Sequence, residues 1–137
     1  MPYRVYHTAD GAIGIAVGSE KLWAAFCAAI ERPELARHPD YETNAGRIRK
    51  RAALGPVLES AFRERSTAEW HARLQAAGIP ASPVRNFGDV VNDPQSAVRN
   101  MFPALEHPTA GLHRVTGTPV KLSETPGAPG HPAPLTG

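Results

Sequence analysis

The sequence predicts an α+β fold in which a small antiparallel sheet packs against three or four helices. Three observations carry this prediction. Residues 3–17 alternate around a central Asp-Gly turn, which is typical of a β-hairpin. Apolar residues then recur at helical spacing between residues 20 and 78. Two alternating runs, near residues 101–106 and 111–122, predict further short strands, and a tail rich in proline and glycine follows them.

The predicted hairpin pairs residues 3–8 with residues 12–17. Asp10 and Gly11 suit the turn, because Asp tolerates a left-handed backbone and Gly has no Cβ to clash there. One face of the second strand is apolar and carries Ile13, Ile15 and Val17. The other face carries only small residues, namely Ala12, Gly14 and Ala16. We therefore expect a helix or another chain to approach the sheet closely on that second face.

The first predicted helix begins near Glu20 and ends before Arg32-Pro33. Ser19 is its expected N-cap, and Glu20 in the first turn complements the helix dipole. One wide apolar face predicts that this helix belongs to the core; it carries Leu22, Trp23, Phe26, Cys27 and Ile30. Cys27 is the only cysteine, and its apolar surroundings favour a structural thiol over a reactive one.

Two more helices are expected before residue 78. The first spans residues 43–65, and Gly55-Pro56 predicts a kink or break within it. Its predicted buried stripe is Ile48, Ala52, Leu58, Ala61 and Phe62. The second begins at a capping box formed by Ser66 and Glu69 and ends at Gly78.

The last part of the chain predicts shorter elements. Residues 79–84 are expected to be extended, because each proline disfavours a helical conformation in the residue before it. Short helices are predicted at residues 87–91 and 93–99, and strands at 101–106 and 111–115 are expected to join the opening hairpin. We expect one small domain over residues 1–122 and an extended tail over residues 123–137.

Composition and charge argue against several classes of function. The net charge of +2 is too small to indicate nucleic-acid binding, and the basic cluster at residues 47–51 is interpreted as a solvated helix face. The six histidines include no zinc-like spacing, and the pair His107 and His113 has no third ligand in a recognised pattern, so no metal site is predicted. No apolar run is long enough to span a membrane and no signal peptide is recognised, so a cytoplasmic location is expected.

A series of short motifs runs along nearly the whole chain. The first is Tyr6 to Gly11 (YHTADG), and it continues through residues 13–18 (IGIAVG) to Trp23. Later pieces are Arg32 to Leu35, Asn44 with Arg47, residues 62–70, residues 77–80, Pro83-Val84, residues 93–95, Met101, His107-Pro108, residues 117–120, Leu122-Ser123 and Thr125-Pro126. In this order the motifs resemble family III CoA-transferases of the CaiB/BaiF type, which include formyl-CoA transferase and α-methylacyl-CoA racemase.

The resemblance implies that the chain corresponds to the small domain of such an enzyme. In the transferases a carboxylate of the large domain attacks the acyl-CoA thioester, whereas the racemases use a histidine and an acidic residue to exchange the α-proton. No residue here matches those motifs, and Asp10 has a sufficient role in the turn. The resemblance thus implies no catalytic residue and no cofactor bound by this chain alone. A coenzyme A thioester is the implied substrate of the complete enzyme.

One loop, formed by Gly18, Ser19 and Glu20, is the candidate substrate-facing site. In racemase-like members the loop after the corresponding strand supplies a glutamate near the catalytic histidine. Here fewer residues separate Glu20 from the aromatic residue Trp23, which favours a role for Glu20 at the helix N-terminus. The alternative is that the loop faces the acyl site in a complete enzyme.

Two functional hypotheses follow. The first is a fragment or separately encoded small domain of an acyl-CoA transferase or racemase, inactive alone, whose partner is the large CoA-binding domain in cis or in trans. The second is a stand-alone, non-catalytic binding or oligomerisation module with the same fold. Under both hypotheses we expect a homo-oligomer and no nucleic-acid or membrane partner.

Overall fold

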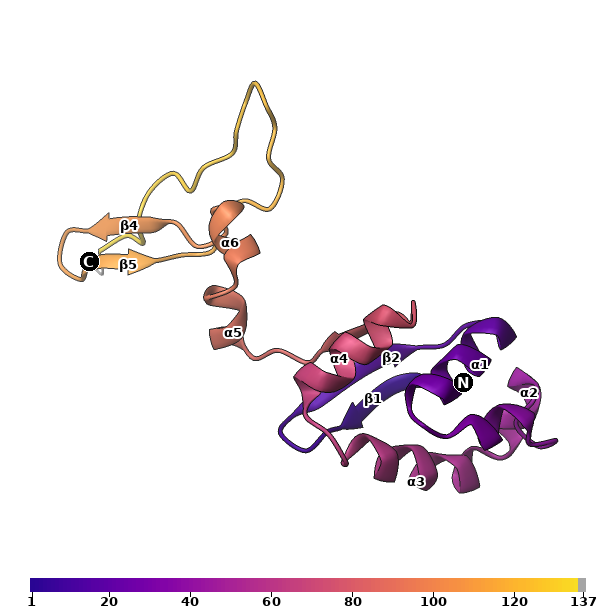
Figure 1. The fold of residues 1–137 in the computed structure, drawn as a ribbon. Coiled ribbons are helices and arrows are strands. Elements are labelled where there is room, and N and C mark those ends of the chain that lie inside the picture. Colours follow the sequence, from indigo (N-terminus) through magenta and orange to yellow (C-terminus); the bar gives the residue numbers. More distant parts are fainter. Residues whose placement is uncertain (136–137) are drawn as a thin grey trace. The chain divides into compact units, whose positions relative to one another are not determined.

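The predicted opening hairpin forms two strands of a three-stranded antiparallel sheet (Figure 1). Strand β1 is Tyr3–His7 and strand β2 is Ala12–Ala16, paired so that Tyr6 lies opposite Ile13. The computed structural model describes residues 1–135. These residues divide into two units, Met1–Val84 and the part from Arg85 onward, and each is described by itself. The prediction of one domain over residues 1–122 followed by a tail is not tested by this division and stays a prediction.

The third strand of this sheet comes from a different segment than the one predicted. Strand β3, Ala81–Pro83, pairs antiparallel with β2 and occupies its second edge. A proline is tolerated there because β3 is an edge strand, where one side of the backbone needs no ladder partner. On the other edge of the sheet, the backbone amide of His7 donates to the Glu59 carboxylate at 3.3 Å.

The two later strands form a separate sheet. Strands β4, Ala104–His107, and β5, Gly111–Arg114, pair antiparallel with each other in the second unit. The expectation that they join the opening hairpin is therefore wrong. The physical reason is that the free edge of β2 is taken by β3, while β4 and β5 satisfy each other across their own short turn.

The helices of the first unit follow the predicted order with one different boundary. Helix α1 is Glu20–Ala29, the 3₁₀-helix η1 is Pro33–Arg37, and helix α4 is Thr67–Ala76. The long helix predicted over residues 43–65 is divided at Lys50 into α2, Asn44–Arg49, and α3, Arg51–Phe62.

The predicted kink or break at Gly55-Pro56 is not where the helix divides, because α3 continues through Pro56. Pro56 has no amide to donate to the carbonyl of Ala52, so α3 lacks one backbone hydrogen bond at this point and continues without it. The division at Lys50 also changes the predicted buried stripe. Ile48 and Ala52 are exposed, whereas Leu54, which was not predicted, is fully buried.

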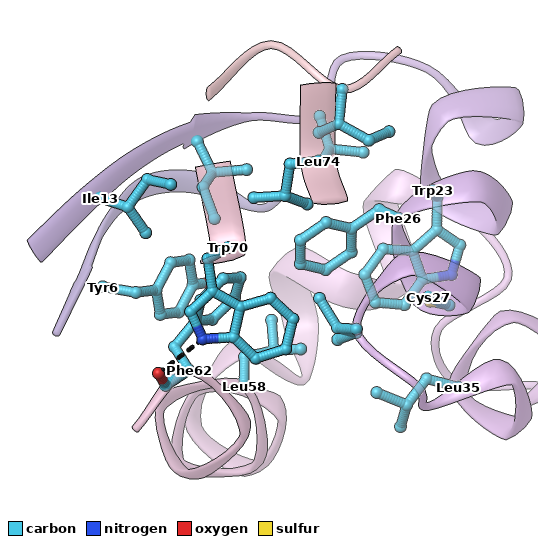
Figure 2. Packing of buried hydrophobic residues seen from close by; sticks show 14 of the residues in the cluster. Tyr6, Ile13, Trp23, Phe26, Cys27, Leu35, Leu58, Phe62, Trp70 and Leu74 are labelled. Carbon is cyan, nitrogen blue, oxygen red and sulfur yellow. Dashed lines mark hydrogen bonds between the residues drawn. The ribbon is translucent and has the colours of Figure 1, made fainter. Parts of the chain in front are cut away.

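The core of the first unit lies between the sheet and helices α1, α3 and α4 (Figure 2). Phe62 occupies its centre, since its ring centroid lies 4.8 Å from that of Tyr6, 5.0 Å from that of Trp70 and 6.1 Å from that of Phe26. The indole Nε1 of Trp70 donates to the carbonyl oxygen of Phe62 at 2.8 Å, so the buried indole N–H has a partner. Cys27 lies in the same cluster, as predicted for a structural thiol.

The second unit contains short elements. Helices α5, Phe87–Val91, and α6, Pro94–Val98, lie where short helices were predicted, and they precede β4 and β5. None of residues 85–135 is buried. Several large apolar side chains of this segment are strongly exposed, among them Phe87, Val98 and Leu112. The second unit therefore lacks a hydrophobic core within the described residues.

Candidate functional site

The predicted site residues form the connection between β2 and α1. Gly18 is exposed, and a Cβ added to it would meet no atom within 4 Å. Ser19 is the N-cap of α1, as predicted, and its hydroxyl accepts a hydrogen bond from the amide of Leu22 at 3.2 Å. The carbonyl of Ser19 also accepts from the amide of Trp23 at 2.9 Å. The turn is thus open at Gly18 and fixed at Ser19 by the first turn of the helix.

Glu20 has two partners, and both come from α2. One carboxylate oxygen accepts from the amide of Asn44 at 2.9 Å, and the other lies 2.8 Å from Nη1 of Arg47. The hydrogen bond from Asn44, followed by that from Arg47, holds the pKa of Glu20 below its ordinary value of 4.5. Glu20 is therefore ionised near neutral pH and is suited to holding α1 against α2, not to donating a proton.

Arg47 is the site residue that sequence reasoning missed. It was interpreted as part of a solvated helix face, but its side chain is only 1% exposed. Its Nε donates to the carbonyl of Met1 at 2.6 Å, and Nη1 donates to the carbonyls of Tyr41 at 2.8 Å and Glu42 at 3.2 Å. The guanidinium carbon lies 4.7 Å from the ring centroid of Trp23. The one signal in the sequence was that Asn44 and Arg47 are among the motifs that carry the family resemblance.

The aspartates mostly hold the local structure together. Asp10 accepts from both the amide and the hydroxyl of Thr67, a contact that was not predicted. Neither Asp10 nor Gly11 has the left-handed backbone expected at the turn. Asp40 pairs with Lys50 at 3.3 Å. Asp89 belongs to the capping box of α5, and Asp93 caps α6.

The histidine pair has a turn-forming role. The Nδ1 atom of His107 accepts hydrogen bonds from the amides of Thr109 at 3.2 Å and Ala110 at 3.1 Å. Its ring lies 5.9 Å from that of His113. Within residues 1–135 no group of three or more metal-ligating side chains comes together. Over the same residues, no helix is long and apolar enough to cross a membrane.

A second candidate surface is the outer face of the first sheet. Small residues line it, as predicted, and an open depression of about 620 Å³ lies over Gly14, Ala16 and Ala81. Tyr3 and Val5 of β1 border the depression and are exposed, Tyr3 to 82%. This face of the sheet is therefore apolar and carries little side-chain bulk.

Comparisons with known proteins identify the family. The family model described as CoA-transferase family III matches residues 1–137. The human succinyl-CoA:glutarate CoA-transferase is 31% identical over 137 residues, which is 100% of this chain and 31% of that protein. The acetyl-CoA:oxalate CoA-transferase of Acetobacter aceti is 34% identical over 93% of this chain and 33% of its own length. The chain thus spans about a third of the length of these curated relatives.

Solved structures agree with this assignment. The crystal structure of Rv3272 from Mycobacterium tuberculosis superimposes with a TM-score of 0.80 at 28% identity, over 91% of this chain and 35% of that one. A CaiB/BaiF family protein from Brucella suis gives a TM-score of 0.78 at 27% identity, over 95% of this chain and 34% of that one. The resemblance seen in the sequence is therefore confirmed, and the chain belongs to CoA-transferase family III.

Proposed function

We propose that this chain supplies the small domain of a family III acyl-CoA transferase, as a fragment or as a separately encoded polypeptide. The observation that carries the proposal is the family match over residues 1–137, combined with coverage of only 31% of the human relative. In this proposal the large CoA-binding domain supplies the catalytic carboxylate. The chain alone is then inactive, and a coenzyme A thioester is the substrate of the complete enzyme.

The named relatives favour CoA transfer over racemisation. Three relatives whose names give the CoA acceptor are CoA-transferases for glutarate, mesaconate and oxalate. All three acceptors are dicarboxylates, so we assign the complete enzyme a dicarboxylate as CoA acceptor. The reaction exchanges one thioester for another: succinyl-CoA and glutarate, for example, give succinate and glutaryl-CoA.

In this proposal the Gly18–Glu20 turn faces the acyl site. The open space beside Gly18 supports this role, because a substrate can approach the backbone closely there. Glu20 then acts by holding the turn through Asn44 and Arg47, and not as a general acid. This agrees with the role at the helix N-terminus that the sequence favours for Glu20, and transfer chemistry needs no racemase-like glutamate there.

The proposed partners are the large domain and a second copy of the chain. The exposed apolar side chains of the second unit and the outer face of the first sheet support them, since a monomer rarely leaves such surface uncovered. The stand-alone binding module is the alternative, and the same surfaces would serve it. Only the transferase proposal requires that the chain restore CoA transfer to a large domain.

The test is a chimera of the human succinyl-CoA:glutarate CoA-transferase in which this chain replaces the matching segment. We expect glutaryl-CoA to form from succinyl-CoA and glutarate with the chimera, and not with the isolated chain. Transfer of CoA by the isolated chain, or a folded chimera without activity, would overturn the proposal. Mixing this chain with the separately expressed large domain provides a second route if the chimera does not fold.

A glycine substitution tests the turn separately. Gly18→Ala adds a methyl group where there is space for it, so the variant is expected to fold normally. If the turn faces the acyl site, the variant chimera has a lower kcat/KM. Gly130→Ala is the matched control, because a Cβ at Gly130 also meets no atom within 4 Å. Equal kcat/KM values for the two variants would show that the turn does not face the acyl site.

A further inference from the structure

Arg47 is a buried cation bound mainly by backbone. Among residues 1–135, Arg47 is the one charged residue that is buried. The side chains of Arg32, Arg65 and Arg73, which also form ion pairs, are 32–34% exposed. Its guanidinium donates to carbonyls of the N-terminal segment and of the loop before α2. Buried arginine is uncommon unless its charge and its N–H groups are satisfied.

Two of its contacts are with the first turn of α1. The carboxylate of Glu20 lies 2.8 Å from Nη1, and the ring of Trp23 lies below the guanidinium at 4.7 Å. Glu20 and Trp23 are three residues apart, so both side chains are on one side of that turn. A single side chain from α2 therefore contacts the helix directly after Gly18 and Ser19.

Glu20 strengthens this connection from its own side. Its second oxygen accepts from the amide of Asn44, the first residue of α2. The carboxylate thus bridges the N-termini of two helices, and each helix start gains a negative group near its unpaired amides. The side chain of Glu20 is 56% exposed, so it can be changed without leaving a cavity.

Stability alone does not require a cation at this position. Burying the Arg47 guanidinium costs desolvation energy, which its pair with the half-exposed Glu20 offsets only in part, whereas the contacts of the cation fix one relative position of its partners. We propose that Arg47 is a positioning residue, which fixes the Gly18–Glu20 turn through Glu20 and Trp23 and thereby sets the geometry of the acyl site. The catalytic part of this inference rests on the proposed function above.

The first test measures amide hydrogen exchange of the turn in the isolated chain. In Glu20→Gln and Arg47→Lys, we expect the amides of Leu22 and Trp23 to exchange about tenfold faster, because Ser19 no longer holds them in one geometry. Exchange of the α4 amides should stay unchanged, which shows that the fold is intact. Arg49→Lys, on the exposed side of α2, is the matched control. Exchange equal to that of the control in both variants would overturn the inference.

The second test measures kinetics in the chimera with the human transferase. We expect Glu20→Gln to lower kcat about tenfold and to change the KM for succinyl-CoA less than twofold, because misplacing a group near the reacting atoms affects chemistry more than binding. Arg47→Lys should retain more activity than Arg47→Met. An active chimera in which Glu20→Gln equals the Arg49→Lys control overturns the inference. An inactive unsubstituted chimera overturns the proposed function instead, and hydrogen exchange then decides whether Arg47 fixes the turn.

Discussion

The carboxylate of Asp10 accepts two hydrogen bonds from Thr67, one from the backbone amide at 2.7 Å and one from the hydroxyl at 2.9 Å. The hydroxyl of Thr8 lies 2.6 Å from that of Thr67 and also donates to Asp10. Asp10 belongs to the β1–β2 turn, and Thr67 is the first residue of α4. The turn of the hairpin therefore caps a helix that begins far along the chain.

This contact gives the first prediction. Asp10→Ala is expected to lower the free energy of unfolding, because it leaves an amide at the start of α4 without its acceptor and removes a negative charge from the helix N-terminus. Urea denaturation followed by circular dichroism measures the change. The control is Asp40→Ala, which removes an aspartate paired with Lys50 near the surface. If Asp40→Ala proves equally destabilising, the capping role of Asp10 is wrong.

The features that sequence reasoning predicted correctly depend on neighbouring residues. Alternation placed Ile13, Ile15 and Val17 on the buried face of β2. Local hydrogen bonding placed the caps at Ser19 and Ser66, since each hydroxyl accepts an amide three residues later. Such patterns need no knowledge of the tertiary fold.

The features that it missed depend on contacts between distant segments. The short strand β3 was recognised only as extended, because its pairing partner β2 is remote in the sequence. The basic run at residues 47–51 suggested solvent exposure, yet Arg47 faces inward once α2 ends at Lys50 and Met1, Tyr41 and Glu42 supply carbonyls. For the same reason, the sequence identified the Gly18–Glu20 turn as a candidate site but did not show which residue holds it.

The second prediction concerns Phe62 at the centre of the core. Phe62→Ala removes a fully buried ring that stacks on Tyr6 and contacts Trp70, so we expect unfolding to become easier by about 3–5 kcal/mol. The same substitution at Phe87, which is 92% exposed, serves as the control and should change stability by less than about 0.5 kcal/mol. Chemical denaturation of both variants checks the difference, and a similar loss in both would contradict the assignment of the core.

The third prediction concerns the single thiol. Burial raises the pKa of Cys27 to about 12, so the reactive thiolate is scarce at neutral pH. We expect Cys27 to resist alkylation by iodoacetamide in the folded chain and to react at a normal rate in urea. Mass spectrometry after timed labelling measures both rates. Rapid labelling without denaturant would show that α1 opens readily or that the thiol is accessible.

The fourth prediction concerns stability in acid, and it follows from Glu31, two residues after the end of α1. Its carboxylate lies 2.7 Å from Nη2 of Arg73 and 3.0 Å from Nη2 of Arg65, and hydrogen bonds from Arg73 and then Arg65 lower its pKa below the ordinary 4.5. The pKa values of Glu20 and Asp10 are lowered as well, chiefly by amide hydrogen bonds from Asn44 and Thr67.

A carboxylate whose pKa is lower in the folded state stabilises the fold fully above its unfolded pKa, and loses that effect as the pH falls through its folded pKa. Stability should therefore change little from pH 7 to pH 5 and should fall steadily below about pH 4.5, where the unfolded chain binds more protons. Urea midpoints measured across this range test the expectation. In Glu31→Gln the midpoint at pH 7 should be lower and its fall in acid shallower, because Glu31 no longer titrates. An unchanged acid slope in this variant would mean that the pairs with Arg65 and Arg73 contribute nothing to the pH dependence.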